Sequence, residues 1–372
     1  MRPKLFVDGR AFDKYFEGTR TYVENLYKII DEIGDFEIFI GSESDVPEAV
    51  FEHSRNTKFV KYRKTQSKLQ RALFEIPEII SKNKIQVSHF QYVTPLIKNS
   101  IQVVTIHDVL FKDFPEQFGF KYRLIKGITF YMSVLRSDIV TTVSQYSKDA
   151  LLKHFHLKPE RVQIIPNGVE PGYFEAYDKN AVKRCIFAKY GVDNFILCVS
   201  RIEPRKNQLG LLKAYLDLQL YDRNINLVFI GKKDINVPEL ERLMESLPDN
   251  VVKHIFFLSN INNDDLKAFY QAAMVFVYPS LAEGFGIPPL EAAALKTPTI
   301  CSNRTAMEDF LFFGENHIDP NPESIKTALL NTIDGVPETK LEEIRKTIIK
   351  NYNWQSAATK LNQLMWNKVK HT

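Results

Sequence analysis

The chain has 372 residues, of which 44% are hydrophobic and 25% are charged, and its formal net charge is only +4. This balance excludes a disordered chain, and the small charge gives no argument for nucleic-acid binding. Because the length exceeds what one hydrophobic core usually fills, we expect a globular protein of two domains.

Neither a membrane-spanning segment nor a signal peptide is predicted. The longest apolar runs, at 255–258 and 274–278, fall far short of the roughly 20 residues that a membrane helix needs and instead indicate buried strands. The N-terminus reaches Asp8 too early for a signal peptide. The three cysteines lack metal-ligand spacing, and we expect buried free thiols in a reducing cytoplasm.

Positive charge is concentrated in residues 55–84, which hold nine lysines and arginines against two glutamates. Two interpretations stay open. The segment is either a solvated basic face or a site of peripheral contact with an anionic membrane, where each nearby cation adds about 1 kcal/mol. We therefore expect a cytoplasmic protein, with the inner face of the membrane as one candidate location.

In the first half of the chain, strand-like apolar stretches alternate with helix-like ones. Strands are predicted at 4–7, 37–40, 59–62, 87–90, 103–106, 139–143 and 162–165. Helices are predicted at 21–33, 67–82, 122–137 and 148–154. This alternation favours a parallel sheet that is covered by helices on both faces.

The alternation begins again after a segment that contains proline and glycine, and we place a linker at 170–190. Further strands are predicted at 195–200, 227–231, 255–258, 274–278 and 299–302. Further helices are predicted at 207–220, 238–246, 264–271, 288–295, 322–333, 341–351 and 354–370.

The chain therefore predicts an α/β protein with two doubly wound, Rossmann-like parallel-sheet domains, 1–175 and 176–351. Residues 352–372 would form a final helix that packs back on the first domain. Two such domains would face each other across a cleft, lined by the carboxyl ends of both sheets, where ligands bind.

The most informative motif is a glycine loop, Gly284-Phe285-Gly286, which follows a predicted buried strand and opens a helix. Free backbone N–H groups at such a helix start favour an anion, here a diphosphate. Glu283 and Glu291 flank the loop, eight positions apart. A carboxylate accepts hydrogen bonds from two vicinal hydroxyls, so this pair would hold a hexose and a ribose at the two ends of the diphosphate.

A second motif, residues 199–207, follows the first strand of the second domain. Arg201 and Lys206 are predicted to converge on a pair of phosphates, the arginine as a planar fork and the lysine as a point charge. Fixed cations that neutralise a departing diphosphate would remove the need for a divalent metal. We therefore expect no metal and no cofactor.

Two further signals lie in the first domain. A predicted buried strand ends in His107 and Asp108. At the carboxyl edge of a parallel strand His107 would point into the cleft, with Asp108 orienting or polarising its ring. An earlier loop, residues 16–22, contains Gly18, and its amides would face the same diphosphate.

Together these motifs resemble family 4 of the retaining glycosyltransferases, which have the GT-B fold of two Rossmann-like domains. Residues 283–291 resemble the family's paired glutamates, and 200–207 its phosphate clamp. Residues 165–169, Ile-Pro-Asn-Gly-Val, resemble the turn between its domains, and 352–354 the start of its final helix. The resemblance spans nearly the whole chain.

The resemblance implies roles in the second domain. Arg201 and Lys206 would bind the phosphates of a nucleotide-sugar donor. Glu291 would bind the ribose, while Glu283 and the amides of the glycine loop would hold the sugar.

It also implies roles for four weaker candidates. His107 would contact the sugar or support the charge that develops during transfer, and Gly18 would approach the phosphate. Backbone groups near Gly231 and Leu258 would contact the base. Many relatives have a second glycine in the early loop where this chain has Arg20, so a side chain would replace a backbone contact there.

The activity implied by the resemblance is hexosyl transfer with retention of configuration, in which the leaving phosphate assists deprotonation of the acceptor. The residues at 107–108 and 114–118 are typical of bacterial mannosyl- and rhamnosyltransferase-like members. They favour GDP-mannose as the donor, with a UDP-sugar as the alternative. The expected acceptors are lipid-linked or surface oligosaccharides of polysaccharide biosynthesis.

Three other protein classes fit less well. A sugar-nucleotide epimerase of similar shape would need groups for proton abstraction, and only His107 is a candidate. A non-catalytic nucleotide-sugar binder would bind the donor without turnover, which the intact glutamate pair and phosphate clamp disfavour. A dehydrogenase is disfavoured because the glycine loop lacks the third glycine of a dinucleotide fingerprint.

Overall fold

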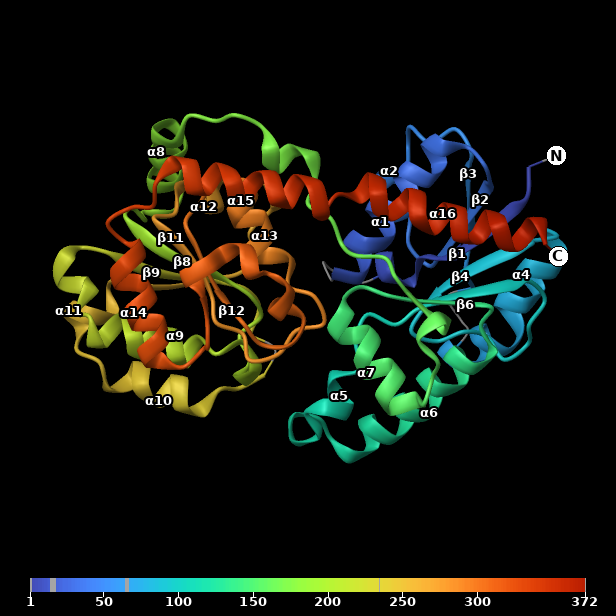
Figure 1. Ribbon diagram of the computed structural model, residues 1–372, viewed down its shortest axis with the longest axis horizontal. Coiled ribbons are helices and arrows are strands. Elements are labelled where there is room, and N and C mark those ends of the chain that lie inside the picture. The colour runs from blue at the N-terminus through green and yellow to red at the C-terminus, as the bar shows by residue number, and fades with distance from the viewer. Residues whose placement is uncertain (1, 14–17, 64–66, 234, 372) are drawn as a thin grey trace. The chain divides into compact units, whose positions relative to one another are not determined.

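The computed structural model describes residues 2–13, 18–63, 67–233 and 235–371, and the chain divides into two compact units (Figure 1). The first unit is Met1–Gly168 with Asn353–Thr372, and the second is Val169–Tyr352. The sequence had placed these boundaries at 175 and 351. Each unit is built on a parallel β-sheet with helices packed on it, so the predicted fold class is confirmed.

The sheet of the first unit has seven strands in the order β3-β2-β1-β4-β5-β6-β7. The strands are β1 (Lys4–Asp8), β2 (Glu37–Ser42), β3 (Thr57–Lys61), β4 (Val87–Gln91), β5 (Ile101–Thr105), β6 (Ile139–Thr142) and β7 (Val162–Ile164). The strand order reverses between β1 and β4, which makes that pair the topological switch point of the unit.

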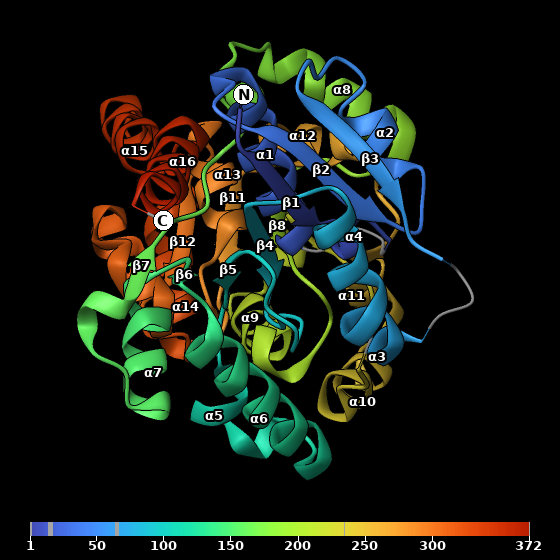
Figure 2. The same ribbon diagram turned by 90° about the vertical axis from the view of Figure 1, so that its right-hand side faces the viewer.

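Two helices at the ends of the chain pack together in the first unit. The helices are α1 (Gly18–Ile33), α2 (Val46–Val50), α3 (Lys68–Gln70), α4 (Ile76–Lys82), α5 (Leu110–Asp113), α6 (Phe120–Arg136), α7 (Gln145–Phe155) and α16 (Trp354–Lys370). Figures 1 and 2 show α16 running along α1. Asn362 on α16 donates to Asp35 over 2.6 Å, and the Trp366 and Phe36 rings are 5.8 Å apart.

Gly168 is the last residue of the first segment of this unit, and only a glycine fits there. A Cβ at this position would lie 2.5 Å from the backbone nitrogen of Trp354, closer than any side chain allows. The Pro-Asn-Gly-Val motif therefore lets two chain segments, 168 and 354, approach at backbone distance inside the first unit.

The second unit repeats the strand order with six strands, β10-β9-β8-β11-β12-β13. They are β8 (Phe195–Val199), β9 (Asn226–Ile230), β10 (Ile255–Leu258), β11 (Val275–Tyr278), β12 (Thr299–Ser302) and β13 (His317–Ile318). The order reverses between β8 and β11. Its core joins strand residues such as Leu227 and Val277 to helix residues such as Leu211 and Leu329.

The helices of the second unit include one that the sequence analysis had assigned to a linker. They are α8 (Lys179–Tyr190), α9 (Gln208–Asp217), α10 (Pro238–Ser246), α11 (Asp249–Val252), α12 (Asn263–Ala272), α13 (Ile287–Ala294), α14 (Pro322–Thr332) and α15 (Glu338–Asn351). The linker prediction at 170–190 was therefore wrong over α8. Asp178 caps this helix and Gly191 ends it at φ +68°, but only Ile186 is buried, so the apolar pattern is weak.

The cysteine prediction was right for two residues of three. Cys198 and Cys301 are buried and Cys185, on α8, is exposed, and all three are free. No helix in the described part of the chain is both long and apolar enough to cross a membrane.

Acidic residues from other parts of the first unit neutralise some of the positive charge of the basic stretch 55–84. At least four of its cations form ion pairs: Lys58 with Glu37, Lys61 with Asp45, Arg63 with Glu78, and Arg71 with Glu43 and Glu75. Glu37, Glu43 and Asp45 come from outside the stretch, so a count within it overstates the charge. Lys64 and the side chain of Lys68 lie outside the described residues.

Candidate active site

The two predicted motifs of the second unit meet at its switch point. Strand β8 ends at Val199 and leads into residues 200–207, and β11 ends at Tyr278 and leads into the glycine loop. Because β8 and β11 are parallel neighbours, the segments that follow them emerge at the same edge of the sheet.

Glu283 is the centre of a cluster of buried polar side chains. Its Oε1 accepts hydrogen bonds from Lys206 Nζ at 2.5 Å, Ser280 Oγ at 2.6 Å and Tyr278 Oη at 2.9 Å. Its Oε2 accepts from Arg205 at 3.1 Å. The structure thus brings Glu283 and Lys206, both predicted site residues, into direct contact.

The charges of this cluster keep Glu283 ionised. Burial raises the pKa of its carboxyl, but the opposite charges of Lys206 and Arg205, together with hydrogen bonds, outweigh burial and lower the pKa to about 2. Lys206 Nζ also donates to Tyr278 Oη at 3.2 Å, which uses two of its three N–H bonds. The ammonium keeps a third N–H for another acceptor.

Arg205 is the member of this cluster that sequence reasoning missed. Its guanidinium bonds Glu203 at 2.5 Å, Glu283, and the Ala282 carbonyl. The signal was its place beside Lys206 in a short turn that begins at Pro204. A 3-10 turn, Pro204–Lys206, ends there, and both side chains reach the loop after β11.

Arg201, the other half of the predicted clamp, lies after the same strand as Lys206. It is exposed, and its carbonyl accepts a hydrogen bond from Gln208 Nε2 at 2.7 Å. Its role in binding phosphate stays a prediction.

The glycine loop is held by packing. Phe285 is 7% exposed, and its ring lies 6.1 Å from Phe310 and 6.0 Å from Tyr352, so only its backbone is left to face a ligand. Gly286 is the N-cap residue of α13 and has a φ of +99°, a backbone conformation that favours glycine.

Glu291, on α13, has a different environment from Glu283. Its Oε2 accepts a hydrogen bond from Tyr270 Oη at 3.0 Å. Burial raises the pKa of its carboxyl, the Tyr270 hydrogen bond lowers it and the charge of Glu170 raises it, with a net value of about 7. One glutamate of the pair is therefore fully charged near neutral pH, and the other is poised between its two forms.

Gly231 and Leu258 lie at the ends of adjacent strands. The N–H of Gly231 donates to the Leu258 carbonyl at 2.9 Å, so these two predicted base-contacting groups bond each other. A Cβ at Gly231 would lie 1.9 Å from the Ser200 carbonyl oxygen, so only glycine allows the ends of β8 and β9 to come this close.

In the first unit, His107 follows the end of β5 and is buried. Its Nε2 lies 2.8 Å from Gln91 Oε1, and its ring is 4.9 Å from that of Tyr22 and 5.2 Å from that of Tyr92. Burial lowers the pKa of His107 to about 3, so the ring is neutral. Gln91, which ends the neighbouring strand β4, was missed because its proximity depends on strand pairing.

Asp108, which we expected to orient His107, accepts a hydrogen bond from the Leu110 amide at 3.2 Å. Gly18 is the first residue of α1, and a Cβ there would meet open space. Phe16 and Glu17, from the same predicted loop, lie outside the described residues.

Arg20, in the first turn of α1, lies 3.7 Å from Glu24 and 5.8 Å from the centre of the Phe12 ring. The predicted roles of Gly18 and His107 need a donor bound by the second unit, so both stay predictions.

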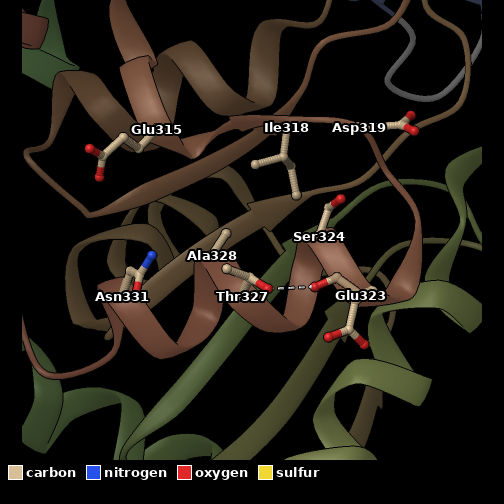
Figure 3. A pocket seen from close by; sticks show the side chains of 8 residues that line it. All are labelled: Glu315, Ile318, Asp319, Glu323, Ser324, Thr327, Ala328 and Asn331. Carbon is tan, nitrogen blue, oxygen red and sulfur yellow. Dashed lines mark hydrogen bonds between the residues drawn. The ribbon is translucent and has the colours of Figure 1, made fainter.

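A pocket of about 290 Å³ lies elsewhere in the second unit, beside α14 (Figure 3). It is lined by Glu315, Ile318, Asp319, Glu323, Ser324, Thr327, Ala328 and Asn331. None of these is a predicted site residue. Asp319 is paired with Arg304, and Thr327 donates to the carbonyl of Glu323, so we assign no ligand to this pocket.

Comparisons with known proteins cover both units. A family model described as "Glycosyltransferase Family 4" matches residues 17–173, and one described as "Glycosyl transferases group 1" matches 181–335. Together they match more than half of the chain. The O-antigen chain mannosyltransferase RfbU of Salmonella typhimurium is 28% identical over 256 residues, which are 69% of this chain and 67% of that protein.

Solved structures share the fold at low sequence identity. Sucrose-phosphate synthase from Thermosynechococcus elongatus has a TM-score of 0.79 and 18% identity, with 100% of both chains covered. Anabaena Alr3699/HepE in complex with UDP-glucose has a TM-score of 0.73 and 14% identity, with 99% of this chain and 100% of that chain covered. The predicted GT-B fold is thereby confirmed.

Proposed function

Because the chain belongs to glycosyltransferase family 4 and has the GT-B fold, we propose that it is a retaining hexosyltransferase that transfers mannose from GDP-mannose. The proposed acceptor is an oligosaccharide or a lipid-linked glycan of surface polysaccharide biosynthesis. The likeness to an O-antigen mannosyltransferase supports this choice. The observation that carries the proposal is the contact of Lys206 with Glu283 at the switch point of the second unit, with Glu291 on the helix that follows.

Lys206 and Arg201 would bind the diphosphate of the donor. Both follow β8, and Lys206 keeps an N–H bond beyond those to Glu283 and Tyr278. As the bond from sugar to phosphate breaks, negative charge grows on the leaving diphosphate. Fixed cations stabilise that charge without reorganisation, which supports transfer without a divalent metal.

Glu283 would hold the donor sugar, because an ionised carboxylate accepts hydrogen bonds from hydroxyl groups. Glu291 would accept hydrogen bonds from the ribose once it has lost its proton. A neutral His107 would offer an uncharged hydrogen-bonding group to the sugar. The leaving phosphate would take the acceptor's proton, so transfer with retention needs no nucleophile from the enzyme.

A UDP-sugar is the alternative donor. The HepE complex with UDP-glucose supports it, because that protein shares the fold. The base would lie near Gly231 and Leu258, where backbone groups rather than distinctive side chains are available.

A thermal-shift screen of GDP, UDP, ADP and dTDP, each with and without a chelator, tests the proposal. A ligand that binds only the folded state stabilises it by RT ln(1 + [L]/Kd), about 2.7 kcal/mol at a hundredfold excess over Kd. We expect GDP to raise the unfolding temperature most, with no effect of the chelator, and GDP-mannose to be slowly hydrolysed. Stabilisation by UDP alone would replace the donor, and no stabilisation by any nucleotide would end the proposal.

A further inference from the structure

Helix α6 is apolar on the side that faces solvent as well as on the side that faces the core. Phe130 and Val134 pack into a core cluster with Val104 and Val140 of the sheet. The large apolar side chains that remain exposed, by 38–72%, are Phe120, Tyr122, Leu124, Ile125, Ile128, Tyr131, Met132 and Leu135. A helix that is apolar all round is normally buried, and a large exposed apolar patch marks an interaction surface.

The exposed residues form one continuous surface. Ile125, Ile128, Met132 and Leu135 follow each other at steps of three and four, so they lie in a single row along the helix. The row is flanked by Leu124 and Tyr131 on the same side. With 17 residues, α6 is about 25 Å long, and Figures 1 and 2 show it on the outside of the first unit.

A neighbouring loop extends this surface at the C-terminal end of α6. Leu96 and Ile97 are 51% and 46% exposed. Arg136 donates a hydrogen bond to the carbonyl of Leu96, and Lys98 Nζ donates to the carbonyl of Arg136 at 3.2 Å. We call the exposed apolar residues of α6 with Leu96 and Ile97 the α6 face.

Helix α6 carries charges of a single sign. Residues 120–136 contain Lys121, Arg123, Lys126 and Arg136, and no aspartate or glutamate. Lys126 Nζ lies 5.7 Å from the centre of the Tyr122 ring and 5.4 Å from that of Phe130, so its aliphatic stem runs over aromatic surface. Exposed apolar side chains bordered by cations are the pattern of a helix that lies in a membrane interface.

We propose that the α6 face binds the surface of an anionic lipid bilayer, with its apolar side chains at the boundary of the headgroups and its cations on the headgroup phosphates. This surface differs from the basic stretch 55–84, whose cations are partly neutralised by Glu37, Glu43 and Asp45. The proposal goes beyond the proposed function, because it needs neither the donor nor the acceptor.

A second copy of the chain is the competing occupant of the α6 face. In a symmetric dimer the same patch of both copies meets. The cations of the two helices would then face each other, and α6 carries no acidic residue to pair with them. Like charges brought together oppose this association, whereas anionic headgroups favour the membrane.

Flotation of the full chain with vesicles tests the proposal. We expect binding to vesicles of phosphatidylglycerol and phosphatidylcholine, and at least tenfold weaker binding to phosphatidylcholine alone. Raising the salt from about 0.1 M to about 1 M, which shortens the Debye length from about 10 Å to about 3 Å, should weaken the binding. Failure of the unaltered chain to bind anionic vesicles at low salt would overturn the proposal.

Variants locate the contact. Ile128→Gln with Met132→Gln should weaken binding to anionic vesicles at least tenfold, as should Lys121→Glu with Arg123→Glu. Leu311→Gln with Leu330→Gln is the matched control, since these residues are 73% and 51% exposed in the second unit, and it should bind like the unaltered chain.

Two results would assign the surface to something else. Equal vesicle binding by the control and the α6 variants would overturn the proposal. So would a dimer, detected by light scattering without lipid, that Ile128→Gln with Met132→Gln dissociates. Unfolding temperatures within a degree or two of the unaltered chain would show that the variants are folded, as expected for exposed positions.

Discussion

At the scale of single residues, Glu283 and Glu291 lie in one loop and the helix that follows it, but their pKa values are shifted in opposite directions. Lys206 and Arg205 lower the pKa of Glu283 to about 2, whereas burial raises that of Glu291 to about 7. If Glu291 binds a ribose, it must be ionised to accept hydrogen bonds from both hydroxyls. Nucleotide binding should then depend on pH through Glu291 and not through Glu283.

We expect the affinity for GDP to fall about tenfold per pH unit below pH 7, because each unit lowers the ionised fraction of Glu291 about tenfold. Isothermal titration calorimetry from pH 5.5 to about 8.5 measures this, and Glu291→Gln is the control, since it cannot ionise. The nucleotide's own titration is common to both proteins. Parallel pH profiles for the two proteins would contradict the assignment.

The raised pKa of Glu291 also predicts the pH dependence of stability without ligand. Between pH 4.5 and about 7 the folded state binds more protons at this group than the unfolded state does. The free energy of unfolding therefore loses the contribution of Glu291 as the pH rises through this window. Urea denaturation should show a smaller loss for Glu291→Gln than for the unaltered chain.

The two cations of the proposed phosphate clamp should differ in their effect on stability. Lys206→Ala removes a partner of the buried Glu283 carboxylate, and breaking a buried ion pair costs about 3–5 kcal/mol, less here because Arg205 remains. Arg201→Ala changes an exposed side chain and should alter stability by less than about 0.5 kcal/mol.

Both clamp variants should nevertheless reduce the slow hydrolysis of GDP-mannose, and the double variant should abolish it. Urea denaturation and nucleotide release measured on the same samples separate the two effects. Arg223→Ala, which removes an exposed ion pair with Asp334, is a matched control. Hydrolysis that survives in the double variant would remove the clamp from the mechanism.

At the scale of elements, two glycines at the ends of a strand and a helix differ in the space around them. At Gly231 the ends of β8 and β9 approach so closely that a Cβ would collide with the Ser200 carbonyl. At Gly18 the start of α1 has open space around it. The first glycine is required by packing, and a requirement for the second would come from a ligand.

Gly231→Ala should therefore destabilise the second unit by about 1–3 kcal/mol or more, because two backbone segments must move apart. Gly18→Ala should leave stability unchanged or raise it by up to about 1 kcal/mol, since alanine favours a helix. If the backbone of Gly18 approaches the donor phosphate, Gly18→Ala should also slow donor hydrolysis. Full hydrolysis with Gly18→Ala would show that this approach does not occur.

At the scale of the whole molecule, the last helix of the chain belongs to the unit that the first residues build. Trp354 to Lys370 form α16, which packs along α1, while the second unit has its own core. Each unit thus has a separate set of buried contacts, and damage to one core should be felt mainly within that unit.

Leu361→Ala, at a fully buried position of α16, should destabilise the first unit by about 2–5 kcal/mol. Hydrogen exchange should become faster in peptides of α1, while peptides of β8 and β9 keep their protection and GDP still binds. Leu329→Ala, at a fully buried position of the second unit, should give the reverse pattern. Equal loss of protection in both units after either change would show a single cooperative structure.

Much of the fold followed from local patterns. Within the described residues, apolar runs at the periods of strands and helices predicted every strand except β13, which has two residues, and the long helices apart from α8. The bounds of α10, β10, β12 and α16 match those predicted. Such patterns are readable because burial on one face repeats with the geometry of the element itself. Helix α8 was not predicted because it buries little apolar surface, so its apolar pattern is weak. Its ends are set by the capping residues Asp178 and Gly191.

The sequence by itself determined the fold class, the family and the positions of the candidate residues, since motif spacing and periodicity are local properties. Only the tertiary structure decided the partners of those residues: Arg205 on Glu283, Gln91 on His107, and the acids that neutralise the basic stretch. It also decided that α6 has an uncovered apolar side. Such facts depend on which segments, distant along the chain, the sheets bring together, and no local pattern contains that information.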